Sequence, residues 1–362
     1  MSLTLSLYIA RQFLVWFATC FGALTSISML FEMVELLRRA SGKPDASITV
    51  VLQMMLLKAP FMSLKLVVFA VLFGAMATFW KLTRTQELVV ARAAGVSAWQ
   101  FLFPAIFSAA LIGAVSVTMV NPLAASLLAQ FERIENRVLK GRSSLLAVSS
   151  EGLWLRQVES EGQSVIRADS VAPGGMILND VIVFRFDRDD RFKDRLDAKS
   201  AELRSGHWAL VEVWRSSPGA PAQYASELAL KTNLTVEKIQ DSFASPESMS
   251  FWQLPSFVRL LELSGFQGHR HWLHFHRLLA TPLLLAAMVL LAAVFSLRLQ
   301  RRGGAMALIA AGVLSGFLIY FVSDLVFALG LSNSIPVVMA AWTPASVTAM
   351  LGMALVFHLE DG

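Results

Sequence analysis

Four histidines in close succession offer the first possible chemistry in this chain. They are His269, His271, His274 and His276, and closely spaced imidazoles can converge on Zn²⁺. Such spacing spreads the side chains around a helix, so we expect interfacial residues that touch lipid headgroups where the helix enters a membrane. A metal site, and with it a membrane enzyme, is the alternative.

Asp324 is the second residue with possible chemistry, because it stands alone among apolar residues that include Phe321 and Leu325. A carboxylate inside a membrane is costly and marks a functional site by default. We favour a structural role, as a neutral acid that is hydrogen-bonded within a helix bundle. Phe317 and Phe321, one turn apart, are candidates for an apolar gate that passes acyl chains, with ordinary packing as the alternative.

Signatures of common enzymes are absent from the sequence. The chain has no GxxxxGK[ST] loop, no HExxH and no GxSxG. Any energy from ATP would therefore come from a partner chain, and we assign no catalytic residue, cofactor or metal ion to this one. Cys20 is the single cysteine, which excludes an intrachain disulfide.

The segment from Thr83 to Gly95 has the pattern of a short helix that ends at a glycine. Such a helix can dock in a groove of a soluble partner, with Glu87 as its acidic residue and Arg84 and Arg92 beside it. An amphipathic connector on the membrane surface is the alternative.

The elements that carry these residues are mostly membrane helices. Of 362 residues, 56% are hydrophobic and only 16% are charged, which is typical of a membrane protein. Apolar stretches long enough to cross a bilayer predict six transmembrane helices, at about residues 8–37, 52–80, 97–128, 268–297, 304–329 and 335–358.

Basic residues predict the orientation of these helices. Short cytoplasmic loops are enriched in Lys and Arg, which places Lys81, Arg84 and Arg92 inside the cell and residues 130–265 outside. Arg38 and Arg39 are exceptions that would lie outside, so we expect them to bind an anionic partner. Arg133 and Arg137, with Lys140 and Arg142, form a second basic cluster that suits the same task. Interfacial anchoring is the alternative for each.

In residues 130–265 apolar and polar residues tend to alternate, with a period of two, which predicts strands. One strand would place Leu178, Ile182, Phe184 and Phe186 on one face, with Asn179 and Arg185 on the other, although Asp180 falls on the apolar face. About six such strands favour a sandwich or jelly-roll. The expected fold is an α-helical membrane protein with an inserted periplasmic β-jellyroll-like domain. Its divisions are residues 1–129, with a cytoplasmic coupling helix at about 83–95, then the β-domain 130–265 and the helices of 266–362.

The run from Glu87 to Ser97, ELVVARAAGVS, resembles the coupling helix of the LptF/LptG family of lipopolysaccharide-export permeases. Further stretches are similar to the LptG branch of this family: Gly152 to Trp154, Lys231 to Thr235, Phe295 to Arg298 followed by Arg301 to Gly304, and Ala341 to Pro344. The resemblance covers nearly the whole chain and includes the order of its parts.

The resemblance implies the permease subunit of an ABC transporter that extracts lipopolysaccharide from the inner membrane. Implied partners are an LptF-like permease, an LptB-like ATPase dimer that binds ATP and Mg²⁺, and an LptC/LptA-like periplasmic bridge; no nucleic acid is implied. Glu87 would sit in the ATPase groove. One departure is Glu32 and Glu35, where relatives similar to LptG tend to carry a basic residue. This departure points to a variant lipid headgroup or to compensation by Lys58 and Lys65.

The sequence therefore predicts a lipid exporter in which an ATPase pushes on the cytoplasmic helix. The basic ends of two helices hold the lipid. The apolar interior of the β-domain would then accept the acyl chains. A scaffold that only anchors the β-domain is the second hypothesis, and a membrane enzyme that uses the histidines or Asp324 is the third.

Overall fold

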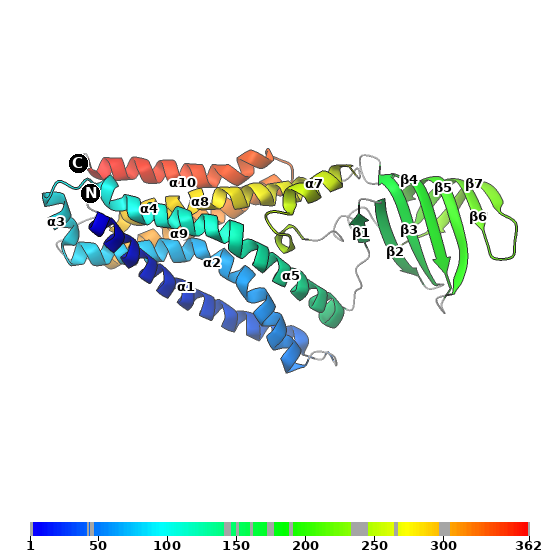
Figure 1. Ribbon diagram of the computed structural model, residues 1–362, viewed down its shortest axis with the longest axis horizontal. Helices are drawn as coiled ribbons and strands as arrows, with labels where there is room; N and C mark the ends of the chain where they lie inside the picture. Colours follow the sequence, from blue (N-terminus) through cyan, green and yellow to red (C-terminus); the bar gives the residue numbers. More distant parts are fainter. Residues whose placement is uncertain are drawn as a thin grey trace. The chain divides into compact units, whose positions relative to one another are not determined.

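The chain divides into a helical unit and a β unit. The computed structural model describes residues 3–41, 43, 47–140, 146–149, 152–159, 162–171, 177–187, 191–232, 245–263, 267–296 and 305–360. The helical unit comprises Met1–Lys140, Glu247–Trp252 and Trp272–Gly362, and the β unit comprises Gly141–Pro246 and Gln253–His271 (Figure 1).

Six helical stretches of the described chain are long and apolar enough to cross a membrane, which confirms the predicted spans. The helices of this unit are α1 Leu3–Ala40, α2 Ile48–Arg84, α3 Glu87–Ala93, α4 Ala98–Val115, α5 Asn121–Glu135, α8 His269–Ser296, α9 Ala305–Leu331 and α10 Val337–Glu360. Two π-helical turns, η1 Ser116–Val120 and η2 Asn136–Lys140, continue α4 and α5, and the 3₁₀ turn η3 spans Pro246–Ser248.

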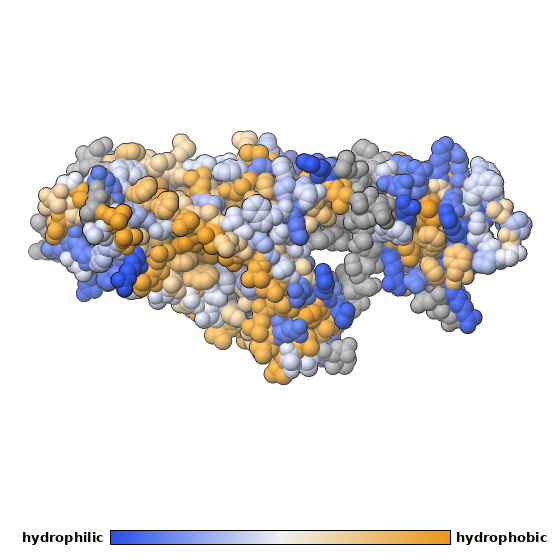
Figure 2. Space-filling model, viewed as in Figure 1, coloured by the Kyte–Doolittle hydropathy of each residue, from blue (hydrophilic) through white to orange (hydrophobic). Residues whose placement is uncertain are grey.

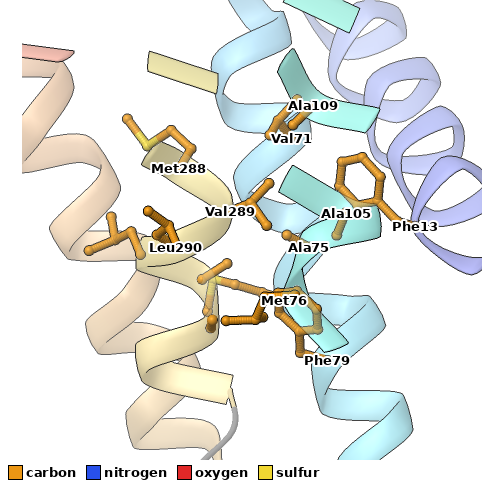
Figure 3. Close-up of a cluster of buried hydrophobic side chains, with 14 of the residues drawn as sticks. Phe13, Val71, Ala75, Met76, Phe79, Ala105, Ala109, Met288, Val289 and Leu290 are labelled. Carbon is orange, nitrogen blue, oxygen red and sulfur yellow. The ribbon is translucent and has the colours of Figure 1, made fainter. Parts of the chain in front are cut away.

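A buried apolar cluster holds α1, α2, α4 and α8 together (Figure 3). Phe13, Phe79, Ala105 and Val289 each contribute a side chain with no exposed surface. Small residues let the helices approach closely, since a Cβ added at Gly113 of α4 would lie 2.6 Å from the Cα of Pro282 in α8. Many apolar side chains on the outside of this unit stay exposed (Figure 2), as expected of helices that face lipid.

The π-helical turn η1 is fastened to the segment that precedes α7 (Leu254–Leu263). The indole Nε1 of Trp252 donates a hydrogen bond to the carbonyl of Thr118 at 3.1 Å. The side-chain oxygen of Asn121 accepts a hydrogen bond from the Phe251 amide at 2.8 Å. A π-helical turn leaves carbonyl groups available to such partners. The indole of Trp252 therefore occupies a backbone acceptor in the third span.

Seven described strands form one antiparallel sheet in the β unit, which confirms the inserted β-domain. They are β1 Leu146–Ser149, β2 Gly152–Glu159, β3 Gly162–Val171, β4 Ile177–Phe186, β5 Phe192–Arg204, β6 His207–Ser216 and β7 Gln223–Lys231. Each strand pairs with the next along the chain, so the described strands follow a meander order.

The predicted face of β4 was wrong beyond Asp180. Leu178 is buried as expected, but the next buried residues are Val181 and Val183, whereas Ile182 is only partly buried. The cause is Asp180, whose φ of 49° turns the strand and shifts the alternation by one residue. Phe184 and Phe186 therefore lie on the more exposed face with Ile182, and Arg185 shares the inner face with Val183.

The sheet buries its inner face by folding over itself. The amide of Gln157 in β2 donates to the Lys231 carbonyl at 3.1 Å, and its oxygen accepts from the Thr232 hydroxyl at 2.8 Å. These contacts join the second strand to the end of the last one. Helix α7 adds Phe257 and Leu261 to the apolar core between them. The two-layer packing expected of a sandwich or jelly-roll is thus achieved within one folded sheet.

A buried charge lies at the edge of this core. Asp194 of β5 has no exposed side-chain surface and forms ion pairs with Arg185 and Arg215. Burial acts to raise the pKa of this carboxyl, but the hydrogen bonds and charges of the two arginines outweigh it, and the pKa lies below its ordinary value. The carboxylate therefore stays ionised in the folded domain.

Candidate functional site

The predicted short helix is present as α3, and both of its ends are fixed. Gln86, with φ of 59°, makes the sharp turn from α2 into α3. At the other end Gly95 has φ of 84°, and the amides of Gly95 and Val96 donate to the carbonyls of Arg92 and Ala91. This is a Schellman ending that favours glycine. Ser97 then caps α4, so α3 joins both neighbouring helices without a flexible linker.

One side of α3 packs against the helical unit and the other side is exposed. Leu88 is buried in the core that contains α1, α2, α4 and α8, whereas Val90 is 69% exposed. Glu87 accepts a hydrogen bond from the Thr85 hydroxyl at 2.8 Å. Arg84 and Arg92 are both exposed, and the guanidinium of Arg84 lies 5.2 Å from the Trp80 ring centroid. An exposed valine beside charged groups gives α3 a free surface for a partner.

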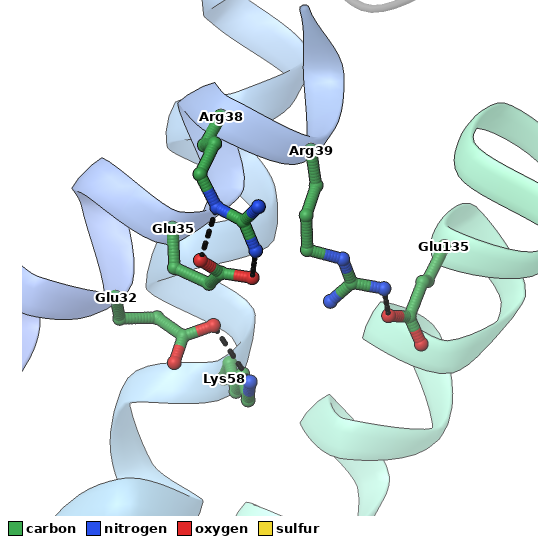
Figure 4. Close-up of polar contacts among 6 residues, drawn as sticks. All are labelled: Glu32, Glu35, Arg38, Arg39, Lys58 and Glu135. Carbon is green, nitrogen blue, oxygen red and sulfur yellow. Dashed lines mark hydrogen bonds and ion pairs between the residues drawn. The ribbon is translucent and has the colours of Figure 1, made fainter.

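Three ion pairs gather where α1 ends, α2 begins and α5 ends (Figure 4). Arg39 of α1 reaches Glu135 of α5 at 2.5 Å, and Lys58 of α2 reaches Glu32 of α1 at 2.6 Å. Arg38 pairs with Glu35 within α1 at 2.8 Å. The two basic regions expected from the sequence, at the ends of helices 1 and 3, are therefore neighbours.

These contacts account for the acidic residues that depart from the family pattern. Glu32 is the ion-pair partner of Lys58, and compensation by this lysine in binding phosphate stays a prediction. Lys65 has a different surrounding and contacts the ring of Phe61. Arg133 of α5 and Arg137 of η2 flank Glu135 and are exposed, and within the described part of the chain neither has an ion-pair partner. Their positive charge is available to an external anion.

Asp324 of α9 forms an ion pair with Arg277 of α8 at 2.8 Å. The contact agrees with a structural role, since Asp324 accepts its hydrogen bond from a neighbouring helix of the bundle. Arg277 also lies 4.4 Å from the Phe327 ring centroid. Sequence reasoning missed Arg277, although an acid inside one apolar helix calls for a base in another.

The two gate candidates on α9 differ in their surroundings. The ring centroid of Phe317 lies 4.8 Å from that of Phe69 in α2, so Phe317 takes part in helix packing. Phe321 is 67% exposed. Phe317 is nevertheless 51% exposed, so both rings are accessible on α9, and their role as a gate stays a prediction.

The histidine cluster does not converge. His271 packs beside Phe257, and the Nδ1 atom of His276 accepts a hydrogen bond from the Trp342 indole at 3.4 Å. Across the described residues, no group of three or more His, Cys, Asp or Glu side chains comes close enough to hold a metal ion. His276 contacts Trp272 and Phe275, as is usual for an aromatic belt at a membrane interface.

Comparisons with known proteins agree with this arrangement. The family described as "Lipopolysaccharide export system permease LptF/LptG" matches residues 7–357. The chain is 25% identical over 296 residues to the lipopolysaccharide export system permease protein LptG of Escherichia coli K12, covering 80% of each chain. It is 25% identical over 282 residues to LptG of Haemophilus influenzae, covering 76% of each. The chain belongs to the LptF/LptG family of lipopolysaccharide export permeases.

Proposed function

We propose that this chain is the permease subunit of an ABC transporter that extracts lipopolysaccharide from the inner membrane and passes it towards the outer membrane. The observation that carries the proposal is helix α3, a rigid, partly exposed helix between two membrane spans of a permease-family chain. ATP is hydrolysed by a separate ATPase dimer, and a second, LptF-like permease completes the membrane part. An LptC/LptA-like bridge receives the lipid.

In this proposal the conformational change of the ATPase pushes on α3. Glu87, Arg84 and Arg92 contact the ATPase groove, and the exposed Val90 supplies apolar contact area. A push on α3 reaches α2 and α4 directly, because capped turns rather than loops connect them. Leu88 transmits the same push to the buried core.

The lipid phosphates bind in this proposal at the ends of α1 and α5. Arg133 and Arg137 offer exposed guanidinium groups, which suit bidentate binding of phosphate. Arg38 and Arg39 stand beside them and already hold carboxylates, so a phosphate competes with Glu35 and Glu135 for these cations. This end of the helices faces the periplasm, as does the β-domain.

The β-domain accepts the acyl chains in this proposal. Its inner face consists largely of Leu, Val and Ala side chains between the folded halves of one sheet. An apolar interior of this kind is the environment that acyl chains favour over water.

Co-purification tests the proposal against a scaffold that only anchors the β-domain. The tagged chain in detergent should bring an ATPase with it, and Glu87→Ala should lose this partner or its lipid-stimulated ATP hydrolysis. Glu202→Ala is the matched control, because Glu202 is an exposed glutamate of β5. Unchanged ATPase recovery and coupling in folded Glu87→Ala would contradict the role of α3.

Crosslinking in membranes tests the lipid site. A photoreactive residue at Leu37 or Arg133 should form adducts with lipopolysaccharide. The control position is Leu7, which is exposed at the other end of α1. The absence of adducts at residues 36–40 and 131–139, or equal yields at Leu7, would refute the site.

A further inference from the structure

The third membrane span changes its packing partners at the π-helical turn η1. Before this turn, Ala109 of α4 lies in the buried cluster of Figure 3, and a Cβ added at Gly113 would lie 2.6 Å from the Cα of Pro282 in α8. After it, Leu128 and Phe131 of α5 belong to a separate apolar cluster, which they share with the ends of α1 and α2. A span whose two halves pack in different cores can bend where they meet, and π-helical turns are common places for helices to bend.

The first two spans also contribute to both cores. Phe13 of α1 and Ala75 of α2 lie in the cluster of Figure 3, whereas Leu36 of α1 and Met54 of α2 belong with α5. Pro60 lies inside α2 near the change, and a proline within a helix removes one of its backbone hydrogen bonds. Two of the ion pairs in Figure 4 join the same three helix ends. These ends are called the arm here: residues 32–40 of α1, 50–61 of α2 and 128–139 of α5 and η2.

Pro122 deprives one carbonyl of the third span of its donor within the helix. In an α-helix the amide of residue 122 would donate to the carbonyl of Thr118, but proline has no amide hydrogen and its ring crowds that carbonyl. The hydroxyl of Thr118 donates to the carbonyl of Ala114 at 2.7 Å, and such bonds to the preceding turn also bend helices. The third span is therefore weakened at η1 by two effects at once.

The indole of Trp252 supplies the missing donor. Its Nε1 atom lies 3.1 Å from the Thr118 carbonyl oxygen. The neighbouring Phe251 amide donates to the side chain of Asn121, which is only 6% exposed. The ring of Phe251 stacks on that of Phe275 in α8, with 5.1 Å between the centroids. Residues 251 and 252 therefore tie η1 to α8, and the indole can leave the carbonyl because Trp252 is 63% exposed.

We propose that the arm turns about η1 and that the indole of Trp252 locks this hinge by donating to the Thr118 carbonyl. In the locked state the arm keeps a fixed angle to α8. In the unlocked state water replaces the indole at the carbonyl, and α5 can bend away from the axis of α4. Bending breaks no bond between residues 122 and 118, because Pro122 has already removed it. The lock is thus worth about one neutral hydrogen bond, which a ligand can outweigh.

The arm carries the lipid site proposed above, so the hinge and the site are on one moving part. Arg39 lies at the α1 end of the arm and Arg133 at the α5 end. A bulky lipid between these ends is accommodated more easily when α5 can turn, and a ligand shifts a protein towards the state that binds it better. We therefore expect lipopolysaccharide to unlock the hinge. This expectation rests on the export function proposed above, whereas the hinge itself follows from the packing of the helices.

Distances between spin labels test the lock on the full chain in nanodiscs, with the chains that co-purify with it. Cysteines for labelling are introduced in a Cys20→Ser background. One pair joins α5 to α8 at Gln130 and Leu279, and the control pair joins α4 to α8 at Leu111 and Leu279, all exposed positions. Trp252→Phe keeps an aromatic ring but loses the N–H donor. It should raise the ratio of unlocked to locked arm about fivefold in the first pair and leave the control distance unchanged.

Two further variants keep the test decisive. Trp214→Phe removes an indole from an exposed position of β6 and should leave both distances as in the wild type. Pro122→Ala returns an amide donor to the Thr118 carbonyl, so in this background Trp252→Phe should no longer shift the distance between α5 and α8. An unchanged distance in Trp252→Phe, an equal change in both label pairs, or an undiminished shift in the Pro122→Ala background would overturn the lock.

Addition of lipopolysaccharide separates the hinge from what unlocks it. In the wild type the lipid should shift the distance between α5 and α8 in the same direction as Trp252→Phe does. A shift in Trp252→Phe without one on lipid addition would support the hinge and refute the lipid as what unlocks it. Recovery of the ATPase is measured in the same preparations. Its absence would refute the exporter proposal, while the effect of Trp252→Phe would still decide the lock.

Discussion

Replacing Glu32 by Gln removes the acid from an ion pair that ties α1 to α2. The Nζ atom of Lys58 lies 2.6 Å from Glu32 Oε1, and the two side chains are only 19% and 10% exposed. Lys58 also lies 5.1 Å from the centroid of the Phe131 ring. After the substitution the lysine keeps this ring but loses its counter-charge in a poorly hydrated place.

The size of the effect follows from this burial. Removing one partner of a buried ion pair costs about 3–5 kcal/mol of the free energy of unfolding. Gln retains an oxygen that can accept from Lys58, so we expect the lower end of the range, about 3 kcal/mol. For a unit of this size each kcal/mol lowers the melting temperature by about 2–4 °C. The expected shift is about 6–12 °C.

Glu35→Gln is the matched control on the same helix. Its partner Arg38 is 74% exposed and Glu35 itself is 44% exposed, and exposed ion pairs contribute little because water competes for both charges. Thermal unfolding in detergent, followed by tryptophan fluorescence, should show a large shift for Glu32→Gln and almost none for Glu35→Gln. Adding Lys58→Gln to Glu32→Gln should recover most of the loss. Equal shifts in both single variants would refute the reasoning.

Three further predictions concern a helix contact, the coupling helix and the β-domain. Gly113→Ala should lower the melting temperature in the same assay, because its Cβ meets the α8 backbone, whereas Gly22→Ala should not, because nothing lies within 4 Å of its Cβ. Gly95→Ala should strain the left-handed ending of α3 by about 1 kcal/mol. It should reduce lipid-stimulated ATP hydrolysis more than it reduces the amount of ATPase that co-purifies. The pKa of Asp194 is lowered by folding, so its stabilising effect is present above the unfolded pKa of about 3.9 and is lost as pH falls through the lower folded value. Near-ultraviolet circular dichroism from pH 7 to about 3 should show this acid transition, and Asp194→Asn should flatten it while lowering stability at pH 7.

The membrane spans were predictable because they depend on length and composition alone. Each long apolar stretch had to cross a bilayer, and the helices begin and end within several residues of the expected positions except the third, which continues to Leu139 instead of ending near residue 128. Helix α3 was also predictable, because a glycine at its end supplies the left-handed turn that Gly95 adopts.

Ion-pair partners could not be predicted, because they depend on which helices become neighbours. Glu135 lies 96 positions from Arg39 in the chain, and Arg277 lies 47 positions from Asp324. Nothing local marks either pair. A useful signal was present in Gly312 and Gly316, since two glycines four residues apart in a membrane helix favour close packing with another helix.

The face of β4 was mispredicted for a local reason. Alternation assumes that every residue is extended, and an aspartate at φ of 49° breaks that assumption. Glu212 in β6 has φ of 53° and produces the same change, since Leu210 and Val213 are both buried on the inner face. Acidic residues in otherwise apolar strands were the visible sign that the alternation would shift.

The basic residues near the ends of α1, α2 and α5 differ in what a phosphate must displace. Arg39 already holds Glu135, and this contact ties α1 to α5, so a phosphate that takes Arg39 loosens the two helices from each other. Arg133 and Arg137 have no such partner among the described residues, and a phosphate reaches them at no cost in helix contacts. In the function proposed above, the lipid therefore binds first at Arg133 and Arg137, where no contact is displaced. Its engagement of Arg39 then breaks the contact of Arg39 with Glu135 and frees α1 from α5.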